Sequence, residues 1–480
     1  MGFSGIDYGI LLIYLIGTAA LGFYFARFQK SARDYFLGSR DMPWPAVSLS
    51  IVATETSTLT FIGIPALSYG SDMTFIQITF GYFIARILIS LFFIPAYYHG
   101  ELYTAYAFLE KRFGARTRDF ASGTFMVTRL FADGVRLFAT AIPLKILTGL
   151  SYPTSIAIIC AVTIVYTYLG GLRAVIWMDA VQIVIYLAGA AVAFLVILGK
   201  IPGGWEAIHT LAAQGDKFKM FDFDFSWTTT YTIFSGIIGG AFLTMATHGT
   251  DQLIVQRLLA CKNVRDSQKA LISSGFLIIL QFLFFLTLGV MLYAFYQTFP
   301  DRLSISRNDE VFPLFIAREM PTGIGGLLIA AIFAAAMSTL SSSLNSLASS
   351  TMMDWIKPYL RPNWSEKQEL FFSRLATIAW AVLLIGVAAM AGSWGNVLEA
   401  GLKIASFTYG GLLGAFLLGL SSQRIGQREA ILAMMAGLSV MLYVSTTAIA
   451  WPWYVAIGAL TAIVSGHLLR LAFSLAGNEK

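Results

Sequence analysis

Long apolar stretches follow one another through almost the whole chain of 480 residues, with short polar connections between them. The composition is 57% hydrophobic and only 12% charged, whereas a soluble domain carries about 25% charged residues. Stretches of this length predict an all-α, polytopic membrane protein, and the alternating strands of a β-barrel are not seen in the sequence. About thirteen helices are predicted, at approximately 5–26, 44–70, 73–98, 119–149, 153–170, 174–199, 228–256, 267–297, 322–353, 368–391, 394–420, 429–448 and 451–473.

The basic residues indicate how the chain is oriented in the membrane. If the N-terminus lies outside, every cytoplasmic connection carries Lys or Arg, for example Arg33, Arg116 and Lys357, as the positive-inside rule requires. An odd number of helices then leaves the C-terminus in the cytoplasm. We therefore expect an integral protein of a bacterial inner (plasma) membrane with its N-terminus outside.

The same composition disfavours several classes of function. The net charge of +6 comes from basic residues spread over short loops, so nucleic acid is not an expected partner. Cys160 and Cys261 form neither a metal motif nor a disulfide framework. No catalytic set recurs near one membrane depth, so we do not expect an enzyme. The expected partners are the lipid bilayer and a small-molecule solute, with no obligatory protein partner.

Two predicted helices contain polar clusters that interrupt their apolar pattern. Residues 53–58 (ATETST) lie in the second predicted helix, and residues 245–251 (MATHGTD) lie in the seventh. Paired broken helices in matching positions of two halves point to a transporter binding site, although two ordinary helices with polar packing residues are the alternative. The spacing predicts an extra helix and loop at 1–43, a first five-helix repeat at 44–199, an outer loop at 200–227, a second, inverted repeat at 228–420 and two peripheral helices at 421–480.

Four short motifs carry a family resemblance. The strongest are residues 334–346 (AAAMSTLSSSLNS) and 170–179 (GGLRAVIWMD), with support from 61–63 (FIG) and from 249–252 (GTDQ) followed by Gln256-Arg257. Together they resemble the sodium:solute symporter family, which includes bacterial proline, sialic acid and galactose carriers. The resemblance implies a LeuT-like inverted five-plus-five helix repeat, Na⁺ as the coupling ion and symport by alternating access.

The resemblance places one Na⁺ between the first broken helix and the ninth predicted helix. The matching residues are Ala53 and Thr56 with their carbonyls, Ala335 with its carbonyl, and Ser338 and Thr339 with their hydroxyls. The chemistry agrees, because a broken helix frees carbonyl oxygens and oxygen ligands suit hard cations. Helix–helix packing is the alternative role for the two hydroxyl residues.

Some members of the family bind a second Na⁺ nearer the cytoplasm. The matching positions are Asp179, Ser338, Ser341 and Ser342, and the three serines share one helix face by their spacing. Alternatively, Asp179 caps the end of its helix or pairs with Arg173. The sequence leaves open whether one or two ions are coupled.

The solute is expected beside the first break, where the ends of half-helices face a central cavity. Arg136 could hold a carboxylate by a bidentate pair, or it could pair internally with Asp133 or Glu55. Arg86 is expected to be structural, and Phe407 and Tyr409 are candidate gate residues. The candidate substrate-binding residues are Glu55, Ser57, Thr60, Gln77, Arg136, Thr247 and His248.

These residues favour a sodium-coupled symporter that imports a small polar organic solute. A carboxylate or an amino-acid-like compound is expected more than a sugar. The galactose carriers of the family have amide and acidic residues at the positions of Glu55, Leu59 and Thr60, and a lysine at that of Ile278. Sugar recognition needs many directional hydrogen bonds. A sodium-coupled sugar symporter and a proton-coupled carrier on the same fold remain the alternatives.

Overall fold

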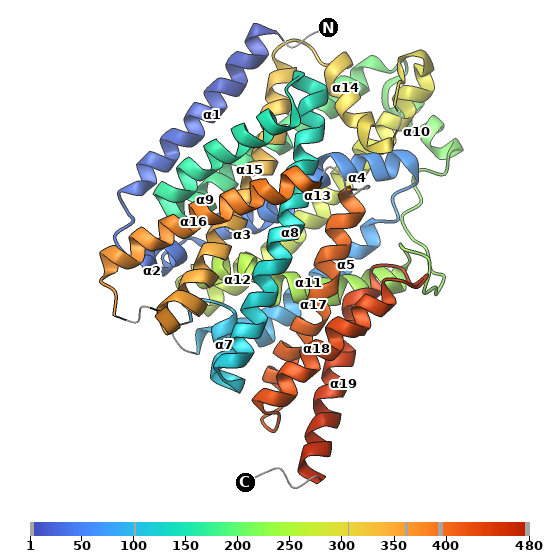
Figure 1. Ribbon diagram of the computed structural model, residues 1–480. Helices are drawn as coiled ribbons and strands as arrows, with labels where there is room; N and C mark the ends of the chain where they lie inside the picture. The colour runs from blue at the N-terminus through green and yellow to red at the C-terminus, as the bar shows by residue number, and fades with distance from the viewer. Residues whose placement is uncertain (1–3, 100–101, 306, 361–362, 392–396, 476–480) are drawn as a thin grey trace.

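Helices form almost all of the regular structure, as Figure 1 shows. The computed structural model describes residues 4–99, 102–305, 307–360, 363–391 and 397–475, without the side chains of 143, 146, 147, 397–403 and 405–407. These described residues contain no β-strand, so the predicted all-α class is confirmed. The long helices are α1 (Gly5–Ala26), α8 (Ala115–Thr148), α9 (Tyr152–Lys200), α13 (Val264–Thr298), α15 (Ile324–Ser350), α16 (Glu366–Ala391), α17 (Val397–Ser421), α18 (Gln427–Val444) and α19 (Trp453–Leu475).

Shorter helices make up the broken spans and the connections. A π-helical segment, Ile89–Phe93, joins two of them into one rod, and a second, Thr351–Leu360, continues α15. The shorter helices are α2 (Ala32–Leu37), α3 (Trp44–Glu55), α4 (Thr58–Gly70), α5 (Ile76–Leu88), α6 (Ile94–Tyr98), α7 (Tyr106–Phe113), α10 (Gly204–Gln214), α11 (Gly240–Gly249), α12 (Gln252–Leu259) and α14 (Val311–Glu319).

The number of membrane spans is only partly settled by the structure. Every predicted range overlaps helical structure. By length and composition, seven helices of the described part could cross a membrane, or eight if α3 and α4 count as one bent span. Helix α8 is not among the seven, and it carries Arg129, Asp133 and Arg136 in its interior. The figure of thirteen spans therefore stays a prediction.

The first predicted break is confirmed. Helices α3 and α4 meet at a bend of 62°, and Thr56 between them has φ −89° and ψ 86°, outside the helical region. Most of α3, including Ser50 to Thr54, and most of α4 are buried among other helices. The carbonyls released by the bend therefore lie inside protein, not in lipid.

The second predicted break is confirmed as well. Helix α11 ends at Gly249 and α12 begins at Gln252, with Thr250 and Asp251 between them. The Asp251 Oδ1 atom accepts a hydrogen bond from the Leu253 amide at 2.9 Å, which caps the new helix. A carboxylate therefore stands at the start of a half-helix, where the positive end of the helix dipole stabilises it.

Helix α9 contains a kink where the sequence predicts two separate helices, 153–170 and 174–199. Gly171 has φ 53° and ψ −155° there, a conformation that L side chains rarely adopt. A Cβ at this position would lie 2.6 Å from the carbonyl oxygen of Tyr35. The glycine is required because the backbone turns and another segment approaches closely at the same point.

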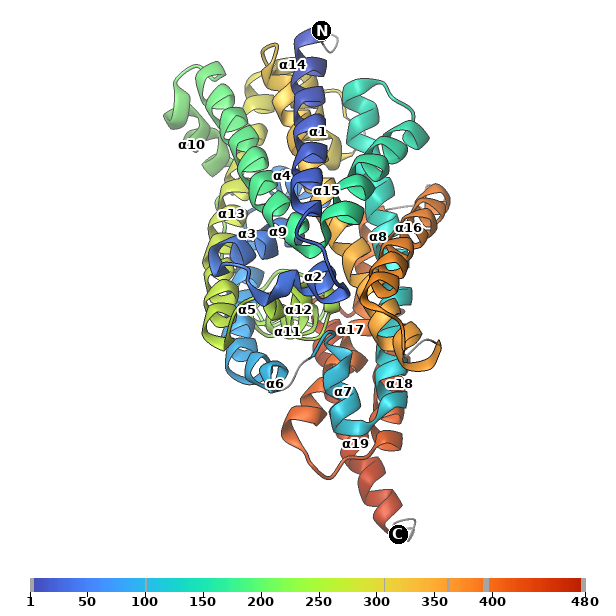
Figure 2. The same ribbon diagram turned by 90° about the vertical axis from the view of Figure 1, so that its left-hand side faces the viewer.

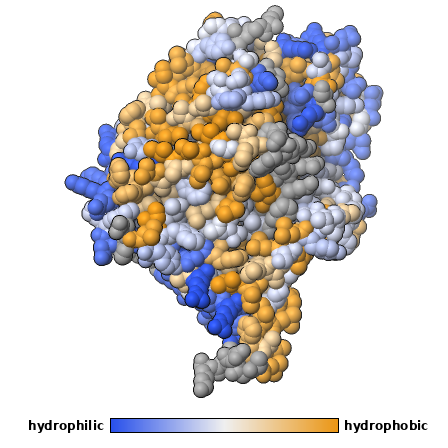
Figure 3. Space-filling view, in the orientation of Figure 1, coloured by the Kyte–Doolittle hydropathy of each residue, from blue (hydrophilic) through white to orange (hydrophobic). Residues whose placement is uncertain are grey.

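Helix α15 lies at the centre of the molecule, and all of residues 328–350 are buried. It packs along α9 and also against α1 and α8, and Figure 2 shows these helices around it. Helix α1 lies at the periphery and exposes Ile13, Ile16 and Phe23. Figure 3 shows a broad apolar band across this face, which suits lipid better than water.

The two ends of the molecule are formed by different helices. Helices α10 and α14 lie at the same end as the start of α1, and α19 ends at the opposite end (Figures 1 and 2). Helix α10 falls within the outer loop predicted at 200–227, and α14 lies in the connection between the predicted helices 267–297 and 322–353. The assignment of either end to the cytoplasm stays a prediction.

Candidate functional site

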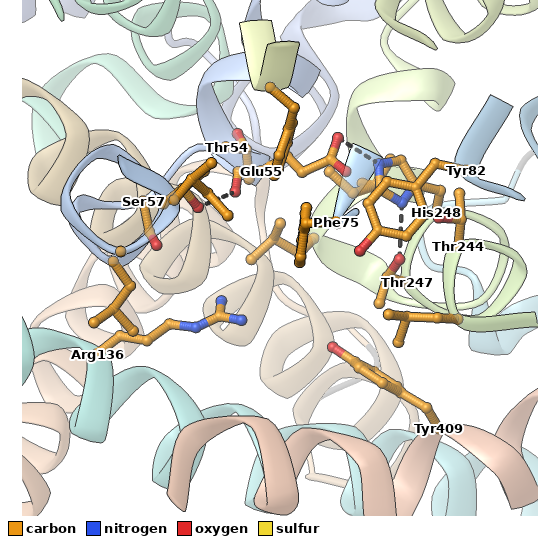
Figure 4. A pocket seen from close by; sticks show the side chains of 18 of the residues that line it. Thr54, Glu55, Ser57, Phe75, Tyr82, Arg136, Thr244, Thr247, His248 and Tyr409 are labelled. Atoms are coloured by element: carbon orange, nitrogen blue, oxygen red, sulfur yellow. Dashed lines mark hydrogen bonds and ion pairs between the residues drawn. The ribbon is translucent and has the colours of Figure 1, made fainter. Parts of the chain in front are cut away.

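A cavity of about 250 Å³ lies where the first break faces α8, α11 and α17 (Figure 4). The structure brings six of the seven candidate substrate residues to its wall: Glu55, Ser57, Thr60, Arg136, Thr247 and His248. Other polar lining residues are Thr54, Tyr82, Arg129, Tyr231, Thr244 and Tyr409. The remaining wall is mainly apolar, so a few polar groups would orient a bound solute.

Gln77 is the exception among the seven candidates, because it does not line this cavity. Its amide nitrogen donates to the carbonyls of Thr74 and Tyr231 at 3.1 and 3.2 Å. Its amide oxygen accepts from the Asp222 amide at 3.0 Å. Gln77 therefore joins α5 to the predicted outer loop and has its amide group bonded to backbone atoms.

Arg136 directs its guanidinium group into the cavity, as Figure 4 shows. Its ion pair with Asp133, Nη1 to Oδ1 at 3.3 Å, is longer than an ordinary charge-assisted bond. Asp133 is also shared with Arg129 at 3.4 Å and with the Ser343 hydroxyl at 2.5 Å. The Arg136 side chain is 29% exposed, and among the described residues Asp133 is the one side chain that its guanidinium group bonds, which leaves N–H groups for a ligand.

A buried charge cluster borders the cavity next to the second break. Arg129 of α8 forms an ion pair with Asp251, and its Nε atom donates to Asp251 Oδ2 at 3.1 Å. The Tyr409 hydroxyl of α17 donates to the same oxygen at 2.9 Å and accepts from Arg129 at 2.7 Å. Arg129 is not among the residues predicted from the sequence, whereas Tyr409 is one of the two candidate gate residues; the side chain of the other, Phe407, lies outside the described residues.

A second cluster joins the end of α3 to α5 and α11. Arg86, fully buried, forms an ion pair with Glu55, which is 14% exposed. His248 lies against both, with Nε2 at 3.2 Å from Arg86 Nη2 and 3.4 Å from Glu55 Oε2. Arg86 thus has the structural role expected from the sequence. Of the two internal partners suggested for Arg136, the structure shows Asp133. The other, Glu55, pairs with Arg86.

The five residues of the first candidate Na⁺ site, Ala53, Thr56, Ala335, Ser338 and Thr339, are all buried. Within the described part of the chain, no hydrogen bond reaches the carbonyl oxygens of Ala53 and Thr56. Buried carbonyls are normally paired, so these two oxygens are available to a cation. The Thr339 hydroxyl donates to the Ala335 carbonyl at 3.3 Å and keeps lone pairs for an ion.

The second candidate site contains a cation supplied by the protein itself. Asp179 accepts from the Ser338 hydroxyl at 2.6 Å and from Arg257 at 3.0 Å, and both charged side chains are fully buried. Arg257 also donates to the Ser342 hydroxyl. The Ser341 hydroxyl donates to the Ser338 carbonyl at 3.0 Å.

Neither alternative role suggested for Asp179 fits this arrangement. Arg173 lies 3.8 Å from Asp41 and not at Asp179, and Asp179 lies in the interior of α9, far from a cap position. In the sequence, Arg257 stands out only as part of a family motif. That motif, Gln256-Arg257, was the available signal for a buried cation.

Comparison with known proteins agrees with this geometry. The model of the sodium:solute symporter family matches residues 35–437. The chain is 32% identical to the sodium/sialic acid symporter SiaT of Proteus mirabilis, over 98% of this chain and 96% of that protein. It is 30% identical to the sodium-coupled monocarboxylate transporter 1 of Xenopus laevis, over 91% and 71%. A solved structure of a Na⁺-coupled sialic acid symporter in a substrate-bound outward-open state superposes with a TM-score of 0.92 at 32% identity, covering 98% of each chain. The chain therefore belongs to the sodium:solute symporter family, and it is a sodium-coupled membrane transporter, not an enzyme.

Proposed function

We propose that the chain imports a carboxylate-bearing organic solute together with Na⁺ by alternating access. The observation that carries this proposal is the Arg136 guanidinium group, which faces the cavity with one long ion pair and an exposed fraction of 29%. Arg presents paired donors that match a carboxylate. The relatives' names add support, since sialic acids and monocarboxylates both carry a carboxylate.

The coupling between Na⁺ and solute is proposed to pass through the first break. Thr56, a candidate ion ligand, is followed directly by Ser57, which lines the cavity. A smaller cavity of about 20 Å³ touches Ser57, Arg136 and Thr339, and so joins the ion site to the solute arginine. An ion bound at Ala53 and Thr56 would fix the break and order the solute site, which gives positive cooperativity.

We retain residues 44–199 and 228–420 as the two inverted repeats, with 1–43, 200–227 and 421–480 outside them, and the N-terminus outside the cell. The first Na⁺ site is the proposed coupling site. A second ion at Asp179, Ser338, Ser341 and Ser342 would compete with Arg257, because that guanidinium already balances the Asp179 charge.

The direct test is uptake by the purified protein in lipid vesicles, with sialic acid, short monocarboxylates, amino acids and neutral sugars as the panel. We expect uptake of carboxylates with external Na⁺ and none with choline at the same pH. Replacing Arg136 with Gln should weaken carboxylate binding at least about tenfold, since a hydrogen bond to a charged group contributes about 1.5–3 kcal/mol.

Lys145→Gln is the matched control, because it removes a positive charge from the same helix at a residue that does not line the cavity. It should keep the affinity of the unaltered protein. A site that takes only neutral sugars would overturn the proposal. Uptake driven by a proton gradient without Na⁺ would contradict the proposed coupling.

A further inference from the structure

The wall formed by Thr247, His248 and Glu55 lies across the cavity from Arg136 (Figure 4). Thr247 and His248 belong to the last turn of α11, and Glu55 ends α3. Behind His248 lies the fully buried Arg86. The donor and the acceptor of each hydrogen bond in this cluster follow from Arg86 through His248 to Thr247.

The assignment starts at Arg86, which is always a donor. Its Nη2 atom carries two hydrogens, one for Glu55 and one for the His248 Nε2 atom at 3.2 Å. The Glu55 carboxylate is 3.4 Å from the same His248 nitrogen, beyond the usual 2.7–3.2 Å of an N–H···O bond. Nε2 of His248 is therefore an acceptor, and the ring hydrogen resides on Nδ1.

The Nδ1 hydrogen of His248 points to the Thr247 hydroxyl oxygen, at 2.8 Å. A threonine in a helix commonly donates back to the carbonyl four residues earlier, as Thr250 does to Ala246 at 2.8 Å. Thr247 has no such bond among the described residues. Its own hydrogen is free on the cavity side, and a hydroxyl that accepts a bond becomes a stronger donor.

The charges around the cavity are balanced without a solute. Arg86, Arg129 and Arg136 face Glu55, Asp251 and Asp133 in the ion pairs already described. An occluded load of one Na⁺ and one anion adds no net charge. A load of one Na⁺ and a zwitterion adds one buried positive charge, which is costly in a closed, dry site.

We propose that the Arg86–His248 relay holds the Thr247 hydroxyl as a donor for a neutral oxygen of the solute, so that the protein selects hydroxy-, oxo- or acylamino-carboxylates over amino acids. This inference rests on the proposed function, with the solute carboxylate at Arg136. His248 acts as the positioning residue and Thr247 as the contact residue. The rival is an ammonium group bound by the exposed part of Glu55.

The test uses matched pairs of straight-chain carboxylates of four to six carbons that end either in a hydroxyl or in an amine. Binding is measured by thermal stabilisation of the purified protein in saturating Na⁺, with the unsubstituted carboxylate of each length as reference. We expect the hydroxy acid of the best-fitting length to bind at least tenfold more tightly than its amine partner.

Three variants, at two residues of the wall, give a readout that a merely structural role would not change. Thr247→Val should bring the hydroxy acid down to the affinity of the unsubstituted carboxylate, which itself should not change. His248→Asn places an amide donor near the Nδ1 position and should keep part of the preference, whereas His248→Phe should lose it. Thr250→Val is the control and should keep the full ratio, because its hydroxyl is bound to the helix and does not line the cavity.

The outcomes separate the two proposals. If carboxylates bind but the amine partners bind as well as the hydroxy acids, the inference is overturned, and loss of amine binding in Glu55→Gln would assign the rival contact. A hydroxy preference that survives Thr247→Val also overturns it. If no carboxylate binds in Na⁺, the proposed function fails and the inference fails with it.

Discussion

Replacing Asp179 with Asn tests whether this carboxylate binds a Na⁺ ion or is the permanent partner of Arg257. The Asp179 Oδ2 atom accepts from Arg257 at 3.0 Å and from the Ser50 hydroxyl at 2.5 Å. Both charged side chains are fully buried. In the Asn variant the Arg257 guanidinium keeps its charge but loses its counter-charge. The new amide NH₂ group cannot accept the hydrogen bonds that Arg257 and Ser50 donate to the carboxylate.

The expected cost follows from this burial. Removing one partner of a buried ion pair costs about 3–5 kcal/mol, whereas removing both charges together is often neutral. We therefore expect Asp179→Asn to lower thermal stability strongly, and the double variant Asp179→Asn/Arg257→Met to regain most of the loss. Ser50→Ala removes one hydroxyl of the same cluster and should cost only about 1–3 kcal/mol.

The assay is thermal unfolding in detergent over a Na⁺ titration, followed by Na⁺-dependent uptake in vesicles for each stable variant. If Arg257 is the permanent partner of Asp179, the unaltered protein and the double variant should both give a Hill slope of about one for Na⁺. An Asp179→Asn variant of normal stability, with a Hill slope that falls from about two to about one, would refute this reasoning. It would show that Asp179 is an ion ligand.

Three further outcomes are expected. Gly171→Ala should destabilise the protein in thermal unfolding by at least about 1–2 kcal/mol, since an alanine is strained at this φ. The control, Gly199→Ala in the same helix, should be neutral, because no atom lies within 4 Å of the new Cβ. Replacing Ser338 and Thr339 together with Ala should abolish stabilisation by Na⁺, and stabilisation that persists would reject the first ion site. Tyr409→Phe removes a hydroxyl that bonds a buried ion pair and should cost about 1–3 kcal/mol, measured by thermal unfolding, and an unchanged melting temperature would contradict this.

The breaks in the helices could be predicted because their causes are local. Threonine, serine and aspartate side chains compete with backbone bonds wherever they occur, so residues 53–58 and 245–251 mark the bends directly. The kink at Gly171 is also visible as a double glycine between apolar stretches. The number of membrane spans is less accessible, because a helix such as α8 carries charges in its interior, and one of them, Arg129, has a partner, Asp251, that only the packed structure reveals.

The partners of the buried charges could not be predicted from the sequence. Arg129 is 122 residues from Asp251, and Arg257 is 78 residues from Asp179, so no spacing rule connects them. In the sequence alone, Arg129 and Arg257 do not differ from other basic residues, because their partners come close only when the helices pack. Gln77 shows the reverse error, since a buried amide in an apolar stretch resembles a binding residue but pairs with backbone groups of the outer segment.

Three buried ion pairs each have one partner at a break or on a half-helix beside it. Glu55 ends α3 and pairs with Arg86 of α5. Asp251, in the second break, pairs with Arg129 of α8, and Arg257 of α12 pairs with Asp179 of α9. Separating any of these pairs in a dry interior is costly, so a rocking motion must carry pairs whole or admit water where they part. The Glu55 and Arg129 side chains both line the solute cavity, so two of these pairs border it, whereas Asp179 and Arg257 are fully buried. Separating Asp179 from Arg257 would therefore be the most costly, and we expect a motion that opens the cavity to keep this pair whole.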